Sequence, residues 1–288
     1  MAKPHNQALN KALVRLNKFI ADSGLCSRRK ADELIHDGQV MLNGKKVFEL
    51  GVKVDPTQDR VLVNGKPVAK QSKFVYYMFH KPKNVVTTLE DPLGRPKVGD
   101  FIDTTERLFP VGRLDWDTEG LLLMTNDGQF AQDVAHPKKE IPKTYLVKID
   151  DHIDPAKLKK LIDGVSIIGG RASAKAAEKV KLGNSKKYEW IKITISEGKN
   201  RQIRRMFEKI GYDVLKLQRI SIGGLKLGAL KKGEYRALNA EDLDRIFHFK
   251  EAHVLGIKPG KHSTKRELRQ RRAAKQRADK KLPSDIFD

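Results

Sequence analysis

The chain has 288 residues, of which 39% are hydrophobic and 33% are charged, so it is long enough for one substantial domain and a smaller one. Lysine and arginine number 58 against 36 aspartate and glutamate, and the resulting formal charge of +22 favours a polyanionic partner such as a nucleic acid. The single cysteine, Cys26, excludes an intrachain disulfide, and the sequence shows no apolar run long enough to span a bilayer and no signal peptide.

Composition and periodicity divide the chain into four pieces. Residues 1–12 form a short polar arm, and residues 13–70 form a small unit with a helical start and short strands. Residues 72–256 form a larger unit in which strands and helices alternate, and residues 257–288 form a basic tail. We therefore expect two folded domains, which begin after the arm and end before the tail.

The small unit begins with two predicted helices. The first helix has four apolar residues on one face, Leu13, Leu16, Phe19 and Ile20. Gly24 ends this helix. Ser27 is a good N-cap for a second helix over 28–36, which closes at Gly38. Two strands then run into Asn43-Gly44 and Asn64-Gly65, and this dipeptide is the strongest short signal for a hairpin.

The large unit combines both kinds of element. Strands are predicted over 74–79, 144–149, 188–195 and 214–222. Helices are predicted over 129–134, 155–162, 200–210 and 240–249. Many strands connect directly or through hairpins, so we predict an α+β fold with a mostly antiparallel mixed sheet.

The last piece loses apolar periodicity. Residues 251–288 carry 11 Lys and Arg against 5 Asp and Glu, a net charge of +6. A transient helix over 265–277 could not bury enough surface to stay folded alone, so we predict disorder. A solvated tail and an arm that contacts RNA are equally consistent with this composition.

Residues 15–35 (RLNKFIADSGLCSRRKADELI) and 38–45 (GQVMLNGK) resemble the S4 RNA-binding domain, a small fold of the α-L type. Arg28, Arg29 and Lys30 would lie in the first turn of the second helix, where its N-terminus also attracts a phosphate. A lone basic triplet could merely solvate a helix end, but the resemblance over some thirty residues favours RNA binding. Arg15 and Lys18 are further candidate RNA contacts.

Residues 109–128 (FPVGRLDWDTEGLLLMTNDG) are similar to the signature of the pseudouridine synthases of the ribosomal small- and large-subunit type. The resemblance runs to about residue 250 and places the catalytic aspartate of the family on Asp115. Without it, Asp115 would be read as a turn or cap residue. Asp117 and Glu119 are predicted to lie in a loop or at the start of a helix. Neither is expected to be a second catalytic acid.

Two further stretches match this family. In KTYLV (143–147), the resemblance makes Tyr145 an active-site tyrosine that stacks on the base. Its hydroxyl is either a proton carrier or part of a core aromatic side chain without that role. In EGKNRQIRRMFE (197–208), it makes Arg204 the expected ion-pair partner of Asp115. Arg201 and Arg205 are expected to face RNA phosphates or the surface.

Two arginines outside these stretches complete the expected RNA contacts, Arg95 in a Pro/Gly turn and Arg113 next to Asp115. The turn DPLGRP (91–96) and the later His136-Pro137 look closest to the branch that acts on large-subunit rRNA. No histidine spacing is typical of a metal site, and no phosphate-binding loop is present.

The resemblance implies that the chain converts a uridine of ribosomal RNA, with 23S rRNA favoured, to pseudouridine. An isomerisation needs no redox step, so we expect no cofactor, and because no histidine spacing is typical of a metal site we expect no metal. We expect a monomer in the cytoplasm, with ribosomal RNA or a pre-ribosomal particle as partner and no membrane attachment. The alternative function is that of a non-catalytic RNA-binding factor in ribosome assembly.

Overall fold

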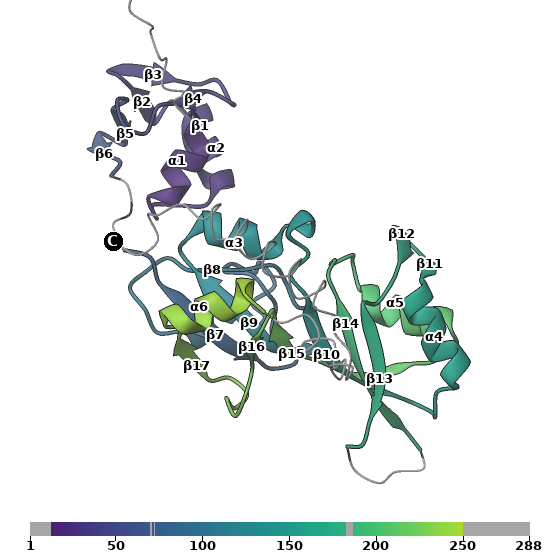
Figure 1. Ribbon diagram of the computed structural model, residues 1–288. Helices are drawn as coiled ribbons and strands as arrows, with labels where there is room; N and C mark the ends of the chain where they lie inside the picture. Colours follow the sequence, from purple (N-terminus) through teal and green to yellow (C-terminus); the bar gives the residue numbers. More distant parts are fainter. Residues whose placement is uncertain (1–12, 70, 72, 183–186, 250–288) are drawn as a thin grey trace, which may run out of the picture.

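The computed structural model describes residues 13–69, 71, 73–182 and 187–249 (Figure 1). The predicted polar arm and the predicted basic tail lie outside the described residues. Figure 1 shows a small N-terminal unit, coloured purple, that stands apart from a larger unit built on one extended sheet. Within the described residues, no helix combines the length and the apolar character needed to cross a membrane.

The small unit packs two helices, α1 (Leu16–Asp22) and α2 (Arg28–His36), on short strands. The hydroxyl of Ser27 accepts a hydrogen bond from the backbone N–H of Lys30 at 3.1 Å, so the predicted N-cap is confirmed. Buried side chains at four-residue spacing on each helix form the centre of its core: Leu16 and Ile20 on α1, Ala31 and Ile35 on α2.

Two strand pairings complete this unit. One is a sheet of order β3-β2-β5-β6, and the other pairs β1 with β4. The strands are β1 (Val14–Arg15), β2 (Val40–Leu42), β3 (Lys45–Val47), β4 (Lys53–Val54), β5 (Val61–Val63) and β6 (Lys66–Pro67). Asn43 and Gly44 have φ values of 49° and 82°, and Asn64 and Gly65 have 51° and 75°. Both predicted Asn-Gly hairpins are confirmed, because this turn requires positive φ at its two central residues.

The large unit is built on a nine-stranded sheet of order β13-β14-β10-β15-β9-β7-β17, with β16 on β15 and β8 on β9. Its strands are β7 (Tyr76–Lys81), β8 (Phe109–Pro110), β9 (Thr118–Thr125), β10 (Lys143–Ile149), β13 (Ala176–Val180), β14 (Glu189–Ile195), β15 (Val214–Ile222), β16 (Leu225–Lys226) and β17 (Tyr235–Ala237). Every pair is antiparallel except β9 with β15, which is parallel. The predicted α+β class with a mostly antiparallel sheet is confirmed.

Helices cover both faces of this sheet. They are α3 (Gly128–Ala135), α4 (Pro155–Asp163), α5 (Gln202–Lys209) and α6 (Ala240–Phe247), close to the four predicted ranges. The apolar sides of α4 and α5 belong to one core cluster, and those of α3 and α6 belong to the other. Short elements fill the connections: two 3₁₀ turns, Val98–Phe101 and Pro137–Lys139, and a hairpin of β11 (Val165–Ile167) and β12 (Gly170–Ala172).

The central strand β9 is the main element that sequence patterning did not predict. All eight of its residues are buried, because it lies between β7 and β15 with a core cluster on each face. Leu121 and Leu123 pack into one cluster, while Leu122 and Met124 pack into the other. A strand buried on both faces reads as a continuous apolar run and lacks the alternation that marks a half-exposed strand.

Candidate active site

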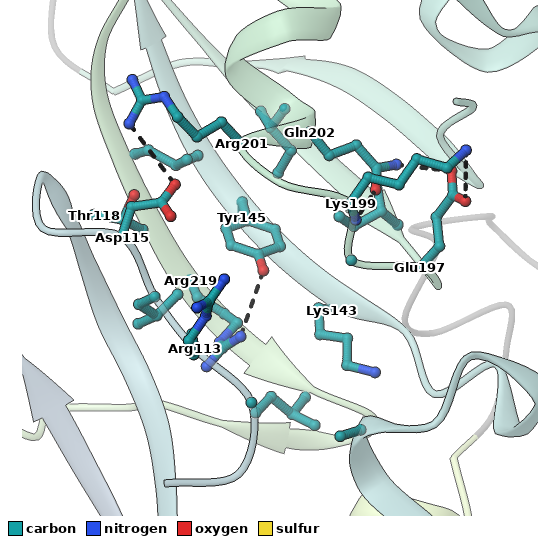
Figure 2. Close-up of a pocket in the computed structure, with 18 of the residues that line it drawn as sticks. Arg113, Asp115, Thr118, Lys143, Tyr145, Glu197, Lys199, Arg201, Gln202 and Arg219 are labelled. Carbon is teal, nitrogen blue, oxygen red and sulfur yellow. Dashed lines mark hydrogen bonds and ion pairs between the residues drawn. The ribbon is translucent and has the colours of Figure 1, made fainter. Parts of the chain in front are cut away.

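A cavity of about 320 Å³ opens where β10 and β15 meet the loop before β9 and the loop before α5 (Figure 2). Asp115, Tyr145, Arg113 and Arg201 line it, so four of the predicted site residues are brought together. Arg204 is not among its lining residues. Segments far apart in the sequence build the cavity, because the order of strands in the sheet places them next to one another.

Asp115 lies in the loop between β8 and β9, and about a third of its side chain (34%) is exposed. The start of β9 holds this loop. The backbone N–H of Thr118 donates to the carbonyl of Asp115 at 3.1 Å, and the ammonium of Lys81 donates to the carbonyl of Thr118 at 2.9 Å. Lys81 is wholly buried, and burial lowers its pKa to about 8. The carboxylate is therefore presented at the cavity by a loop that is fixed at its carboxyl end.

Tyr145 projects from β10 into the cavity and is only 8% exposed. Its hydroxyl accepts a long hydrogen bond, 3.5 Å, from Nη1 of Arg219 on β15 (Figure 2). The ring also belongs to the main core cluster, so the two readings of Tyr145, core aromatic and active-site residue, describe the same position.

Within the described part of the chain, Asp115 forms its ion pair with Arg201, whose Nη1 lies 3.9 Å from the carboxylate and 3.4 Å from Asp117. Arg201 precedes α5 with a left-handed φ of 50°, which is uncommon outside glycine. Such backbone positions concentrate at functional sites, where the surrounding structure compensates their strain. Here this conformation belongs to the residue whose guanidinium reaches the candidate carboxylate.

The expected ion pair between Arg204 and Asp115 is not formed, so that prediction is wrong. Nη2 of Arg204 lies 3.1 Å from the carboxylate of Asp117, and Nη1 donates to the carbonyl of Val214 at 2.8 Å. Arg204 lies within the first turn of α5, and its anchor on the start of β15 directs the guanidinium to Asp117. Burial lowers its pKa, and the attraction of the nearby carboxylates opposes this shift.

Arg219 is a site residue that sequence reasoning missed. It is 5% exposed, its Nε donates to the carbonyl of Leu121 at 2.6 Å, and its Nη2 is buried without a hydrogen-bond partner among the described residues. A buried donor without a partner is costly, so a donor left in this state beside a cavity indicates a place for an acceptor from a ligand. The only sequence signal was an arginine inside a strand pattern.

Lys143 also lines the cavity and was not predicted to be functional. Its ammonium donates to the carbonyl of Val134 at 3.1 Å. Burial, and then the repulsion of Arg219, lower the pKa of Lys143 to about 8. With Arg113, Lys199, Arg201 and Arg219, it makes the cavity lining strongly cationic around two carboxylates, Asp115 and Glu197. This excess of positive charge suits an anionic ligand.

The structure corrects the expectation for Glu119, while Asp117 lies in a loop as predicted. Glu119 is neither in a loop nor at a helix start. It lies on β9, only 1% exposed, between the ammonium groups of Lys216 at 2.7 Å and Lys232 at 2.8 Å. Burial raises the pKa of Glu119, but the two ion pairs outweigh burial and leave it below its ordinary value. Glu119 is thus a structural carboxylate away from the cavity.

The other predicted RNA contacts are spread over the surface. In the small unit Arg15, Arg28 and Arg29 are exposed, while Lys18 pairs with Asp22 and Lys30 with Glu33. In the large unit, the two remaining predicted contacts make local bonds: Arg95 pairs with Asp91, and Arg205 donates to the carbonyl of Ile168. None of these seven side chains lines the cavity.

Comparison with known proteins assigns the chain to a family. Residues 75–209 match the family model for RNA pseudouridylate synthase, and residues 14–59 match the S4 domain. The ribosomal large subunit pseudouridine synthase B of Bacillus subtilis is 44% identical over 233 residues, which are 81% of this chain and 95% of that protein. The chain belongs to the RNA pseudouridine synthase family.

Two further similarities agree with this assignment. A dual-specificity RNA pseudouridine synthase of Escherichia coli is 37% identical over 85% of this chain and 82% of its own length. A crystal structure of a pseudouridylate synthase is 31% identical, covers 81% of this synthase and 99% of its own chain, and superposes with a TM-score of 0.58. The predicted family and the predicted S4 domain are both confirmed.

Proposed function

We propose that this synthase isomerises a uridine of ribosomal RNA, with the large-subunit RNA as substrate and Asp115 as the catalytic carboxylate. The observation that carries the proposal is the cationic cavity in which Asp115 and the ring of Tyr145 are exposed to the same space. The Bacillus subtilis relative is named for the ribosomal large subunit. The net charge of +22 suits an RNA substrate.

The reaction sets the requirements on the cavity. The N1–C1′ bond of uridine breaks, the uracil turns, and a C5–C1′ bond forms. The C5 proton leaves to solvent and N1 gains a proton, so atoms and electrons balance without an oxidant or a reductant. Asp115 would act as nucleophile or base, Tyr145 would stack on the uracil, and Arg219 would offer its free N–H to an oxygen. A duplex hides these atoms, so the uridine enters unpaired or flipped.

Loss of the C5 hydrogen gives a direct test. Ribosomal RNA transcribed with 5-tritiated uridine is incubated with the synthase, and tritium released to water is counted. We expect release that saturates at a defined number of sites for large-subunit RNA. Tight RNA binding with no release from either subunit RNA would support the alternative of a non-catalytic assembly factor and would overturn the proposal.

The division into parts belongs to the same proposal. We propose that residues 13–70 bind RNA as an S4 domain and that residues 72–256 form the catalytic domain, preceded by an arm (1–12) and followed by a basic tail (257–288). The exposed Arg28 and Arg29 at the N-terminus of α2 support the RNA-binding role. We also propose that the synthase acts as a monomer in the cytoplasm, where bacterial ribosomal RNA is modified.

Replacing Tyr145 with phenylalanine tests whether its hydroxyl moves a proton. Tyr145→Phe keeps the ring that packs in the core and removes the acceptor of the Arg219 hydrogen bond. We expect RNA affinity close to that of the wild type and turnover slowed by roughly 10²-fold, the lower range for a positioned acid or base. Single-turnover tritium release measures this rate. Full activity in the variant would remove the proposed proton role.

The lowered pKa of Lys143 leads us to expect a pH dependence of RNA binding. Its pKa is lowered to about 8, so the ammonium is charged below that pH and loses its charge as the pH rises through it. We expect RNA affinity to fall by about tenfold between roughly pH 7 and pH 9, the value of one charge-assisted contact. Lys143→Arg should abolish the fall, because a guanidinium stays charged. Fluorescence anisotropy of labelled RNA measures both. An identical fall in the variant would assign it to another group.

A further inference from the structure

An exposed aromatic side chain lies directly beside the catalytic loop and outside the cavity. Trp116 follows Asp115 in the chain, 39% of it is exposed, and it is not among the residues that line the cavity. The guanidinium carbon of Arg95 lies 5.9 Å from the centroid of its ring, which is a cation–π contact. Single exposed apolar side chains are common on protein surfaces, so what sets Trp116 apart is its place beside Asp115 and its contact with Arg95.

Both members of this pair are held in place. The carboxylate of Asp91 accepts from Nη2 of Arg95 at 2.7 Å, from its Nε at 3.2 Å and from its backbone N–H at 2.9 Å. The Asp91 side chain is only 4% exposed, and the bonds from Arg95 lower its pKa to about 2. The carbonyl of Trp116 accepts from the backbone N–H of Asn84 at 2.9 Å. The guanidinium of Arg95 and the backbone of Trp116 are therefore fixed before any ligand arrives.

The hydrogen bonds from Arg95 to Asp91 also limit which ligand groups Arg95 can bind. Two of its side-chain N–H groups are already used by Asp91, so it is poorly suited to grip a phosphate with its fork. Its planar guanidinium lies next to the indole, and guanidinium and indole faces both stack on nucleobases. The segment that carries Arg95 is joined to the catalytic loop, because the hydroxyl of Thr87 donates to the carbonyl of Leu114 at 2.6 Å.

We propose that Trp116 and Arg95 form a stacking platform for the base next to the target uridine in single-stranded RNA. The inference rests on the proposed function, because it takes the uridine in the cavity as fixed. When that uridine enters the cavity beside Asp115, its neighbour in the strand stays outside, at the rim where the indole is exposed. Stacking there selects unpaired RNA and sets the register of the strand, so the platform determines which uridine reaches Asp115.

The chain contains two tryptophans, and this makes the platform observable. Trp190 lies half-buried on β14 with Lys216 near its ring, and it is not among the cavity residues. Trp190→Phe leaves Trp116 as the one indole, and Trp116→Phe leaves Trp190. Each protein is titrated with a short single-stranded RNA that carries one uridine flanked by adenosines, with excitation of tryptophan alone. Anisotropy of the same RNA, end-labelled, reports binding independently.

We expect saturable quenching of Trp116 in the Trp190→Phe protein and an unchanged signal from Trp190 in the Trp116→Phe protein. In the tritium assay, Trp116→Leu should raise KM by roughly 5-fold to 100-fold, the range for losing one stacked base, with kcat little changed. Trp116→Phe should restore most of the affinity, because it restores an aromatic face. A purely structural role would instead lower thermal stability and kcat in both variants.

The outcomes separate this proposal from the proposed function. RNA that binds without quenching Trp116 overturns the platform, as does a normal KM in Trp116→Leu. Quenching of Trp116 in a protein that releases no tritium from ribosomal RNA supports the platform and overturns the enzymatic proposal. Equal quenching of both tryptophans indicates a general change of the protein on binding and overturns the platform.

Discussion

Asp115→Asn is expected to reduce tritium release from ribosomal RNA by roughly 10⁴-fold or more, as happens when the central group of a catalytic unit is lost. Asparagine has the size of aspartate, and the Asp115 carbonyl that accepts from Thr118 belongs to the backbone, so the loop keeps its conformation. The substitution removes the negative charge and the nucleophilic oxygen. RNA affinity should change little, because the cations of the lining remain.

Asp117→Asn is the matched control for this experiment. Both carboxylates lie near Arg201, at 3.9 Å and 3.4 Å, and they are two residues apart in one loop. Asp117 is the ion-pair partner of Arg204, whose side chain is only 13% exposed, so its loss should lower the melting temperature. We expect it to preserve turnover. If Asp117→Asn were inactive and Asp115→Asn active, the catalytic carboxylate would be Asp117.

Gly120→Ala should cause a large loss of stability. Gly120 has a φ of +113°, and a β-carbon there would lie 2.2 Å from the carbonyl oxygen of Arg219 and 2.6 Å from its nitrogen. These are backbone atoms of the paired strand, and β9 and β15 cannot separate without breaking their pairing. We expect a loss of ~4 kcal/mol or more, which lowers the melting temperature by roughly 10 °C.

Calorimetry of Gly120→Ala and Gly112→Ala would separate this clash from backbone strain. Gly112 also has a positive φ, +71°, but a β-carbon there would meet no atom of the described residues within 4 Å. The Gly112→Ala variant should therefore lose only about 1–2 kcal/mol of unfolding free energy, the cost of placing alanine in the left-handed conformation. Similar losses in both variants would contradict the packing explanation. Because Arg219 also holds Tyr145, Gly120→Ala should lose activity even at temperatures where it stays folded.

Much of the fold followed from local signals in the sequence. The hydroxyl of Ser27 and the Asn-Gly pairs each have one strongly favoured backbone role, so these predictions were confirmed. Strand β9 was missed because its signal is not local. Its burial depends on β15, about a hundred residues further along the chain, and no periodicity within residues 118–125 reveals that pairing.

The site shows the same division. The motif identified Asp115, Tyr145 and the arginines before and within α5, and the cavity brings Asp115, Tyr145 and Arg201 together. A linear motif cannot state which of two arginines three residues apart reaches a carboxylate. That choice depends on the left-handed backbone of Arg201 and on the anchor that draws Arg204 to Val214. Arg219 had no motif around it, and only the sheet order brings it to Tyr145.

The parallel pairing of β9 with β15 also has a consequence for biosynthesis. The start of β9, which holds the loop of Asp115, has its hydrogen-bonding neighbour on one side only after residues 214–222 have left the ribosome. Until then Thr118, Glu119 and Gly120 lack the strand that pairs with them, a contact of long sequence separation that forms slowly. A growing chain therefore completes residues 14–59, which match the S4 domain, well before the cavity around Asp115 can form.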